Sequence, residues 1–120
     1  MTEQTLQKEI ISIIRRFYGY CWRANAGTFK SFDGKRIVHG LPKGFPDIFG
    51  YRYKDGRLFF IEVKNPKGGR IRPEQKEFAR NCVDHNVLHG YADSIDDAIK
   101  IVQGEYEHRK GELANENGLC

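Results

Sequence analysis

The sequence predicts a small mixed α/β fold, on three observations. Apolar residues recur at helical spacing near the N-terminus, and alternating strand patterns flank an Asp-Gly dipeptide in the middle. Two further helical patterns then enclose one short strand. The predicted order is α-β-β-β-α-β-α, in which helices flank a mixed β-sheet. At 120 residues the chain is long enough to bury a core without disulfide or metal support.

The first helix is predicted from Leu6, Ile10, Ile13, Ile14 and Phe17, which fall on one helical face. Thr2 is placed to cap it. Residues 18–26 and 28–39 are rich in aromatic and β-branched residues and are interrupted by glycine, which indicates short strands joined by turns. Their aromatic side chains are expected in the core, although base stacking or a dimer surface are alternatives: Tyr18, Tyr20, Trp22, Phe29 and Phe32.

Residues 47–53 and 57–64 flank Asp55-Gly56, a dipeptide typical of two-residue hairpin turns. With these two residues as the turn, paired positions place Asp47 opposite Lys64. Because opposed and alternate residues share a sheet face, Asp47, Glu62 and Lys64 are expected on one side of the hairpin. Ile48, Phe59, Ile61 and Val63 are then predicted to pack on the other side.

The C-terminal half continues with a Gly-Pro loop at residues 65–72 and a helix that begins at Pro73. A short strand at residues 87–91 follows, and Ser94 is placed to cap a last amphipathic helix. Residues 1–110 are predicted to form a single domain. Residues 111–120 show no periodicity and are expected to form a loose tail.

Basic residues are concentrated in the middle of the chain. Residues 21–73 contain twelve Lys or Arg and four Asp or Glu, although the whole chain has a net charge of only +4. This block predicts a polyanionic partner, with DNA as the first candidate; a well-solvated basic surface is the alternative. No apolar run approaches the length of a membrane span, and the polar N-terminus is unlike a secretory signal. Three scattered cysteines suit a reducing cytoplasm.

Two carboxylates inside a Phe- and Ile-rich segment are costly to bury unless a partner neutralises them. Asp47 and Glu62 are therefore candidate ligands for Mg²⁺ or Mn²⁺, to which the backbone carbonyl of Val63 could add an oxygen. Lys64 is expected to orient a water or to stabilise charge on a phosphate. Glu9 lies at the rim of the first helix and is a candidate third acid; solvent exposure is its alternative. An Asp47–Lys64 cross-strand ion pair is the alternative for that pair, but it leaves Glu62 unexplained.

Gln75 falls in the first turn of the second long helix and is expected to contact phosphate or water, or to cap that helix. The preceding loop is expected to let the backbone approach a DNA strand beside the metal. The candidate DNA-binding residues are Lys43, Lys67, Gly68, Gly69, Arg70 and Arg72.

These motifs together resemble a known family. Gly44-Phe45-Pro46-Asp47, then Glu62-Val63-Lys64, then Gln75 is similar to the PD-(D/E)xK nuclease superfamily, and more narrowly to its VRR-NUC (virus-type replication-repair nuclease) domains. The resemblance implies a restriction-endonuclease-like core that hydrolyses DNA with a divalent metal. It assigns Asp47 and Glu62 as metal ligands, Lys64 as the catalytic lysine and Glu9 as the helical acid.

Stand-alone members of this size resemble Holliday-junction resolvases of phages and bacteria. The expected protein is thus a structure-specific endonuclease of branched DNA that acts as a homodimer, in the cytoplasm of a bacterial or phage-infected cell. A branched-DNA-binding module without catalysis and a restriction-like endonuclease on the same core are the alternatives.

Overall fold

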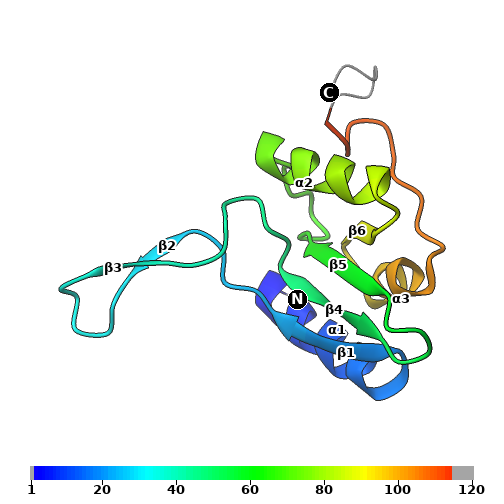
Figure 1. The fold of residues 1–120 in the computed structure, drawn as a ribbon, viewed down its shortest axis with the longest axis horizontal. Coiled ribbons are helices and arrows are strands. Elements are labelled where there is room, and N and C mark those ends of the chain that lie inside the picture. The colour runs from blue at the N-terminus through cyan, green and yellow to red at the C-terminus, as the bar shows by residue number, and fades with distance from the viewer. Residues whose placement is uncertain (1, 115–120) are drawn as a thin grey trace.

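The computed structural model describes residues 2–114. Four strands form the main sheet and three helices pack on it (Figure 1). The elements in chain order are α1 (Glu3–Phe17), β1 (Gly19–Arg23), β2 (Thr28–Lys30), β3 (Ile37–His39), β4 (Ile48–Arg52), β5 (Leu58–Val63), α2 (Pro73–Asp84), β6 (Leu88–Ala92) and α3 (Ile95–Gln103).

The main sheet has the strand order β1-β4-β5-β6. Its first two pairings are antiparallel, and β5 pairs with β6 in parallel through the α2 crossover. The sheet is therefore mixed, as predicted, and its strands with the three helices follow the order α-β-β-β-α-β-α. The remaining strands, β2 and β3, form a separate two-stranded sheet that projects from the body (Figure 1).

One face of the main sheet packs on α1 and α3. Helix α1 begins where Thr2 accepts a hydrogen bond from the backbone N–H of Thr5 (3.1 Å), which confirms the predicted cap. Its Ile10 and Ile14 are fully buried. The sheet side chains beneath them carry no polar group, and all are at most 1% exposed: Cys21, Ile48, Phe59, Ile61 and Val63. Burial of these side chains supplies the apolar core that holds the sheet against α1 and α3.

The opposite face is covered only in part. Helix α2 lies over it through Phe78, whose ring stands edge-on to Phe60 (4.9 Å between centroids) and to Phe45 (5.2 Å). Tyr20 and Trp22 of β1 lie on the same face beyond this cluster and are exposed. The core prediction is wrong for them, and also for Phe29 and Phe32, because α2 stops short of β1 and the β2–β3 hairpin leaves the body. Tyr18 alone of the five packs against the core.

The β4–β5 turn differs from the predicted two-residue turn. Arg52 pairs with Arg57 (N···O 3.0 Å), and four residues close the turn, so the register pairs Ile48 with Ile61. Only Gly56 in it has a positive φ, of 71°. The predicted opposition of Asp47 and Lys64 is therefore wrong by two residues. Because side chains alternate with a period of two, the shift leaves every side chain on its predicted face.

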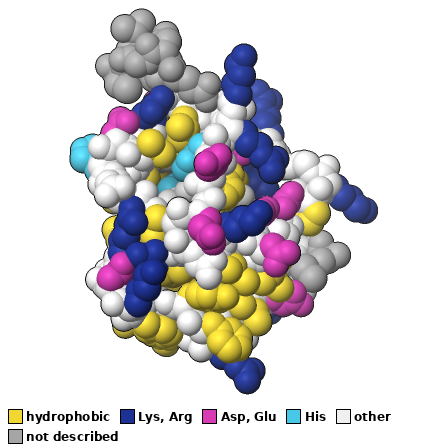
Figure 2. All heavy atoms as spheres, turned by 90° about the vertical axis from the view of Figure 1, so that its right-hand side faces the viewer, with side chains coloured by type: hydrophobic (Ala, Val, Ile, Leu, Met, Phe, Trp, Pro, Cys, Tyr) yellow, Lys and Arg dark blue, Asp and Glu magenta, His cyan; other side chains and the backbone are white. Residues whose placement is uncertain are grey.

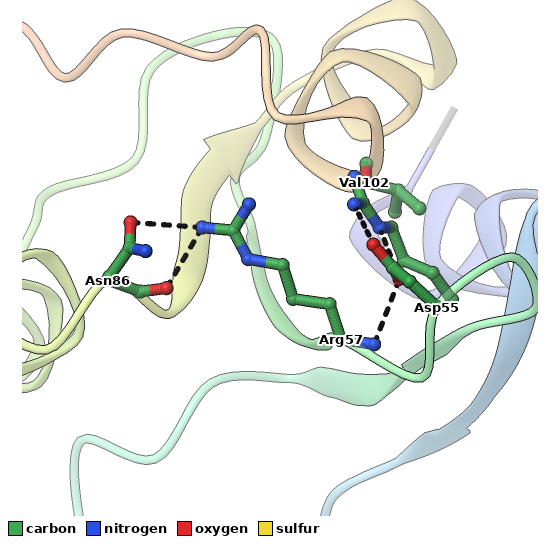
Figure 3. A network of polar contacts seen from close by, with 5 residues as sticks. Asp55, Arg57, Asn86 and Val102 are labelled. Atoms are coloured by element: carbon green, nitrogen blue, oxygen red, sulfur yellow. Dashed lines mark hydrogen bonds and ion pairs between the residues drawn. The ribbon is translucent and has the colours of Figure 1, made fainter.

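A polar network explains the longer turn. Asp55 holds the buried Arg52 guanidinium and accepts from the Arg57 backbone N–H (3.0 Å), so its carboxylate binds both sides of the turn. Arg52 also donates to the carbonyl of Val102 in α3 (3.1 Å), and Arg57 donates to Asn86 (Figure 3). The turn is thereby anchored to α3 and to the end of α2.

Residues 105–114 run back across β6 and α2. Tyr106 donates to the Glu112 carboxylate (2.8 Å), and Ala114 donates to the carbonyl of Lys76 (3.1 Å). Residues 111–114 thus pack on the domain, unlike the loose tail expected there, while residues 115–120 lie outside the described residues. No helix among residues 2–114 is long and apolar enough to cross a membrane.

Candidate active site

Asp47 and Glu62 face one another at one end of the β4–β5 hairpin. The register Ile48 to Ile61, continued by one residue, places Asp47 directly opposite Glu62. The Asp47 carboxylate accepts a hydrogen bond from the backbone N–H of Val63 (2.8 Å), and its own carbonyl accepts from Ala24 (2.7 Å). Pro46 is buried and restricts the backbone just before it. Asp47 is therefore held on both sides by the neighbouring strands.

Glu62 is buried in an unfavourable electrostatic environment. Only 4% of the residue is exposed. This burial, followed by the neighbouring Asp47 carboxyl, raises the pKa of Glu62 to about 9, although Lys64 and Arg72 act in the opposite direction. Near neutral pH the pair consequently retains a proton. A cation between the two carboxylates would relieve both the burial cost and the repulsion.

Lys64 follows on the same face and is held by Gln75. The Lys64 ammonium donates to the Gln75 side-chain oxygen (2.9 Å) and to the carbonyl of Arg70 (3.2 Å). The same Gln75 oxygen accepts from the backbone N–H of Arg72 (2.9 Å), so it also caps α2. Gln75 is only 6% exposed. The cap interpretation of Gln75 is therefore confirmed, and the same side chain also fixes the lysine; its contact with phosphate or water stays a prediction.

Tyr91 is a site neighbour that sequence reasoning missed. It pairs with Glu62 across the parallel β5–β6 ladder. Its hydroxyl donates to the carbonyl of Glu112 (2.8 Å) and lies 3.4 Å from that of Gln75. Burial, then the negative charges of Glu112 and Glu62, raise the Tyr91 pKa. Only the parallel register, which the sequence does not specify, could have placed this phenol beside the acid.

The predicted DNA-binding residues lie on two loops beside the pair. Lys43 and Arg72 converge on Glu74, with N···O distances of 3.9 and 3.3 Å. Gly44 has a φ of 93°, and a Cβ there would stand 2.7 Å from the backbone oxygen of Glu74. This glycine allows the loop before Asp47 to press against the start of α2.

The second loop carries Lys67, Gly68, Gly69 and Arg70, which are exposed. Gly68 has a φ of 98°, and a Cβ on Gly69 would come within 3.2 Å of the Lys64 side chain. The loop thus lies close against the predicted catalytic lysine. Contact of either loop with DNA stays a prediction.

Glu9 lines a surface hollow with Pro66, Asp93 and Asp96. Within residues 2–114, no three His, Cys, Asp or Glu side chains gather closely enough to form a metal site. The roles of Glu9 and of the Val63 carbonyl as metal ligands stay predictions.

The fold and this carboxylate-lysine arrangement define a restriction-endonuclease-like α/β protein. The family model described as VRR-NUC domain matches residues 1–95, and the chain belongs to this family. It is accordingly a nuclease domain whose substrate is DNA. No curated protein and no solved structure matches the chain.

The residues present fit a hard divalent cation. The donors are carboxylate oxygens, which Mg²⁺ and Mn²⁺ prefer. The pair is fixed by a backbone hydrogen bond before any ion binds, and the raised pKa of Glu62 shows that two negative charges are not otherwise balanced there.

Proposed function

We propose that this nuclease domain is a divalent-metal-dependent endonuclease that cuts branched DNA, with four-way junctions as its preferred substrate. The opposed Asp47–Glu62 pair carries this proposal, because Glu62 is buried and its pKa is raised by the neighbouring acid. Burial of two acids side by side costs stability, and binding of a metal ion is a function that accounts for this cost.

Each residue of the site has a separate role in this proposal. Asp47 and Glu62 hold the ion, for which Val63 and Glu9 are candidate further ligands. When bound, Mg²⁺ or Mn²⁺ would polarise the scissile phosphate and lower the pKa of an attacking water. Lys64 places its positive charge where negative charge develops on the phosphate, and Gln75 keeps the ammonium in that position.

Junction cleavage further predicts a homodimer. One domain has one such carboxylate pair, whereas symmetric cuts in two strands need two, and two-fold symmetry provides them. The site of action proposed is the cytoplasm of a bacterial or phage-infected cell.

Cleavage of labelled four-way junctions, flaps and plain duplex, with Mg²⁺, Mn²⁺ or EDTA, tests the proposal. We expect metal-dependent cutting of the junction that EDTA abolishes. Asp47→Asn should abolish cutting while DNA binding remains. A wild-type protein that binds junctions but never cuts them would instead be a binding module. Equal cutting of plain duplex would favour a restriction-like enzyme.

Sedimentation of the wild-type protein, alone and on a junction, tests the homodimer separately. We expect two copies per junction. A single copy that cuts both strands would contradict the two-fold arrangement.

A further inference from the structure

The hairpin formed by β2 and β3, hereafter the arm (residues 28–39), is not explained by packing. Every residue of its two strands is exposed, and it projects away from the main sheet (Figure 1). An isolated two-stranded hairpin is marginally stable in water. The arm therefore contributes little to the core, which indicates that it serves a contact outside the domain.

The arm is basic. Lys30, Lys35 and Arg36 are exposed, and none of their side chains makes an ion pair within residues 2–114. The single acid of the arm, Asp33, is occupied by hydrogen bonds from the Ser31 hydroxyl (2.6 Å) and the Lys35 backbone N–H (3.0 Å). With three cationic side chains and one carboxylate, the arm has a net charge of +2, and its cationic groups face solvent.

The two faces of the arm differ. Opposed residues share a face, so Lys30 lies with Thr28, Ile37 and His39 on one side. Phe29 and Val38 oppose one another on the other side, where the Phe29 ring lies over Gly40. The first face therefore presents Lys30 and two hydrogen-bonding side chains beside the exposed Ile37, and the second face is apolar at Phe29 and Val38. Phe32 extends from the turn with a relative exposure of 111%.

The arm is continuous with the active site. A hollow of about 530 Å³ lies at its base and is bounded by residues 26–28 and 39–44 together with Arg72. Lys43, Gly44 and Arg72 also belong to the loops beside Asp47. A DNA strand bound at the two carboxylates could therefore pass through this hollow, which Lys43 and Arg72 line, and continue along the arm.

We propose that the arm is a DNA-binding ribbon that enters the major groove of the duplex beside the scissile phosphate. The proposal rests on the proposed function of the carboxylate pair. A two-stranded β-ribbon has dimensions that the major groove accommodates, and the net positive charge of the arm complements phosphates. Paired arms from two copies would instead bring like charges together. The opposite side of the molecule carries interspersed acidic and basic side chains, so charge does not favour DNA there (Figure 2).

The experiment compares two triple variants in an Asp47→Asn background, which isolates binding from cleavage. One removes the arm charges (Lys30→Ala, Lys35→Ala, Arg36→Ala). The matched control removes exposed body charges on α1, the β4–β5 turn and α3 (Lys8→Ala, Lys54→Ala, Lys100→Ala). Both variants lower the net charge by the same amount, so the control accounts for the loss of overall charge. The Kd for a labelled junction and its duplex arm is measured by fluorescence anisotropy at several KCl concentrations.

We expect the arm variant to bind at least about tenfold more weakly, and its log K against log[salt] slope to fall by about 2 to 3, since each lost phosphate contact removes about 0.9. The control should retain the parent slope to within about 1. Equal affinities and slopes for the two triple variants would overturn the proposal. Thermal unfolding checks that both remain folded, as expected for exposed substitutions.

A second variant tests whether the arm binds another copy of the chain instead. Phe32→Ser should leave the sedimentation coefficient of the free protein unchanged. Its dissociation into monomers, with an unchanged salt slope, would assign the arm to a protein contact and overturn the proposal. Failure of the proposed function is distinguishable, because then the wild-type protein itself would not cut DNA with metal, whether or not it binds the junction.

Discussion

The two faces of the main sheet are built from the same strands, but one face packs the apolar core and the other carries the candidate active site. Towards α1 and α3, the apolar side chains of β4 and β5 are at most 1% exposed, and the charged residue on this face is Arg52 at the end of β4, which reaches the carbonyl of Val102. Towards α2, β5 presents Phe60 and Glu62, and Asp47 lies just before β4. In β5, buried Ile61 and Val63 alternate with Phe60 and Glu62, so one strand supplies both packing and chemistry. Substitutions of neighbouring residues in β5 should therefore affect different properties, either DNA cleavage or the free energy of unfolding.

Glu62→Gln tests the chemical face with the largest expected effect. Loss of one charge from the pair should lower metal-dependent cleavage at least about 10³-fold, or about 4 kcal/mol of transition-state stabilisation. The free energy of unfolding in metal-free buffer should not decrease, because a buried amide avoids the charge cost that raises the Glu62 pKa. Urea denaturation and cleavage rates measure the two effects. Glu77→Gln, on the exposed side of α2, is the control and should change neither.

Ile61→Ala tests the packing face one residue away. Ile61 is fully buried, and its truncation should lower the free energy of unfolding by about 2 to 5 kcal/mol. Ile37→Ala, the same change on the exposed arm, should cost less than about 0.5 kcal/mol. Well below its melting temperature, the folded Ile61→Ala protein should still cut DNA. Loss of activity without loss of stability would contradict the division between the faces.

His89 lies on the same face of the sheet as the site, and its burial makes the free energy of unfolding depend on pH. Burial, then the nearby His108, lowers the His89 pKa to about 3, so the imidazole stays neutral in the folded protein. The unfolded chain takes up a proton below a pH of about 6.5. Stability from this residue is therefore present above that pH and is lost as the pH falls.

The contribution of His89 to this loss should be about 2 kcal/mol between pH 7 and pH 5. Because the raised pKa of Glu62 acts in the opposite direction over the same range, the loss is measured as the difference in pH dependence between wild type and His89→Phe, by urea denaturation at both pH values. His85→Gln, at an exposed position, should leave the pH dependence unchanged. An equal pH dependence in wild type and His89→Phe would contradict the assignment.

Gln75→Ala should have the smallest effect on cleavage, about tenfold, because it releases Lys64 without removing its charge. It should also cost about 1 kcal/mol of stability through the lost cap of α2. Gln75→Glu keeps an acceptor for both hydrogen bonds and should restore most of the stability. Cleavage by Gln75→Ala at the wild-type rate would show that Lys64 needs no such support.

The local patterns of the sequence were sufficient for most elements and for the face that carries the site. Thr2, Pro73 and Ser94 start their helices as predicted, because caps depend on neighbouring residues only. Asp47 and Glu62 were placed on one face even though the turn was two residues too short. That prediction tolerated the error because only an odd shift moves side chains to the other face.

Features that depend on distant contacts were not predictable from the sequence. The longer turn requires Arg52, whose guanidinium reaches the end of α3. Tyr91 reaches Glu62 only through the parallel pairing of β5 with β6. The exposed Trp22 and Phe29 have the composition of core residues, and only the extent of α2 and the direction of the arm leave them in solvent.

The four-residue turn between β4 and β5 sets the strand register that places Asp47 opposite Glu62. Deletion of Tyr53 and Lys54 would keep Arg52 paired with Arg57 and Asp47 opposite Glu62. A turn that paired Lys54 with Arg57 across Asp55 and Gly56 would instead slide Asp47 onto Lys64. The Asp47 carboxylate would then be neutralised by Lys64 rather than by a cation, although every side chain would stay on its own face of the sheet. The pairing of Arg52 with Arg57 is therefore as necessary to the carboxylate pair as the two acids themselves.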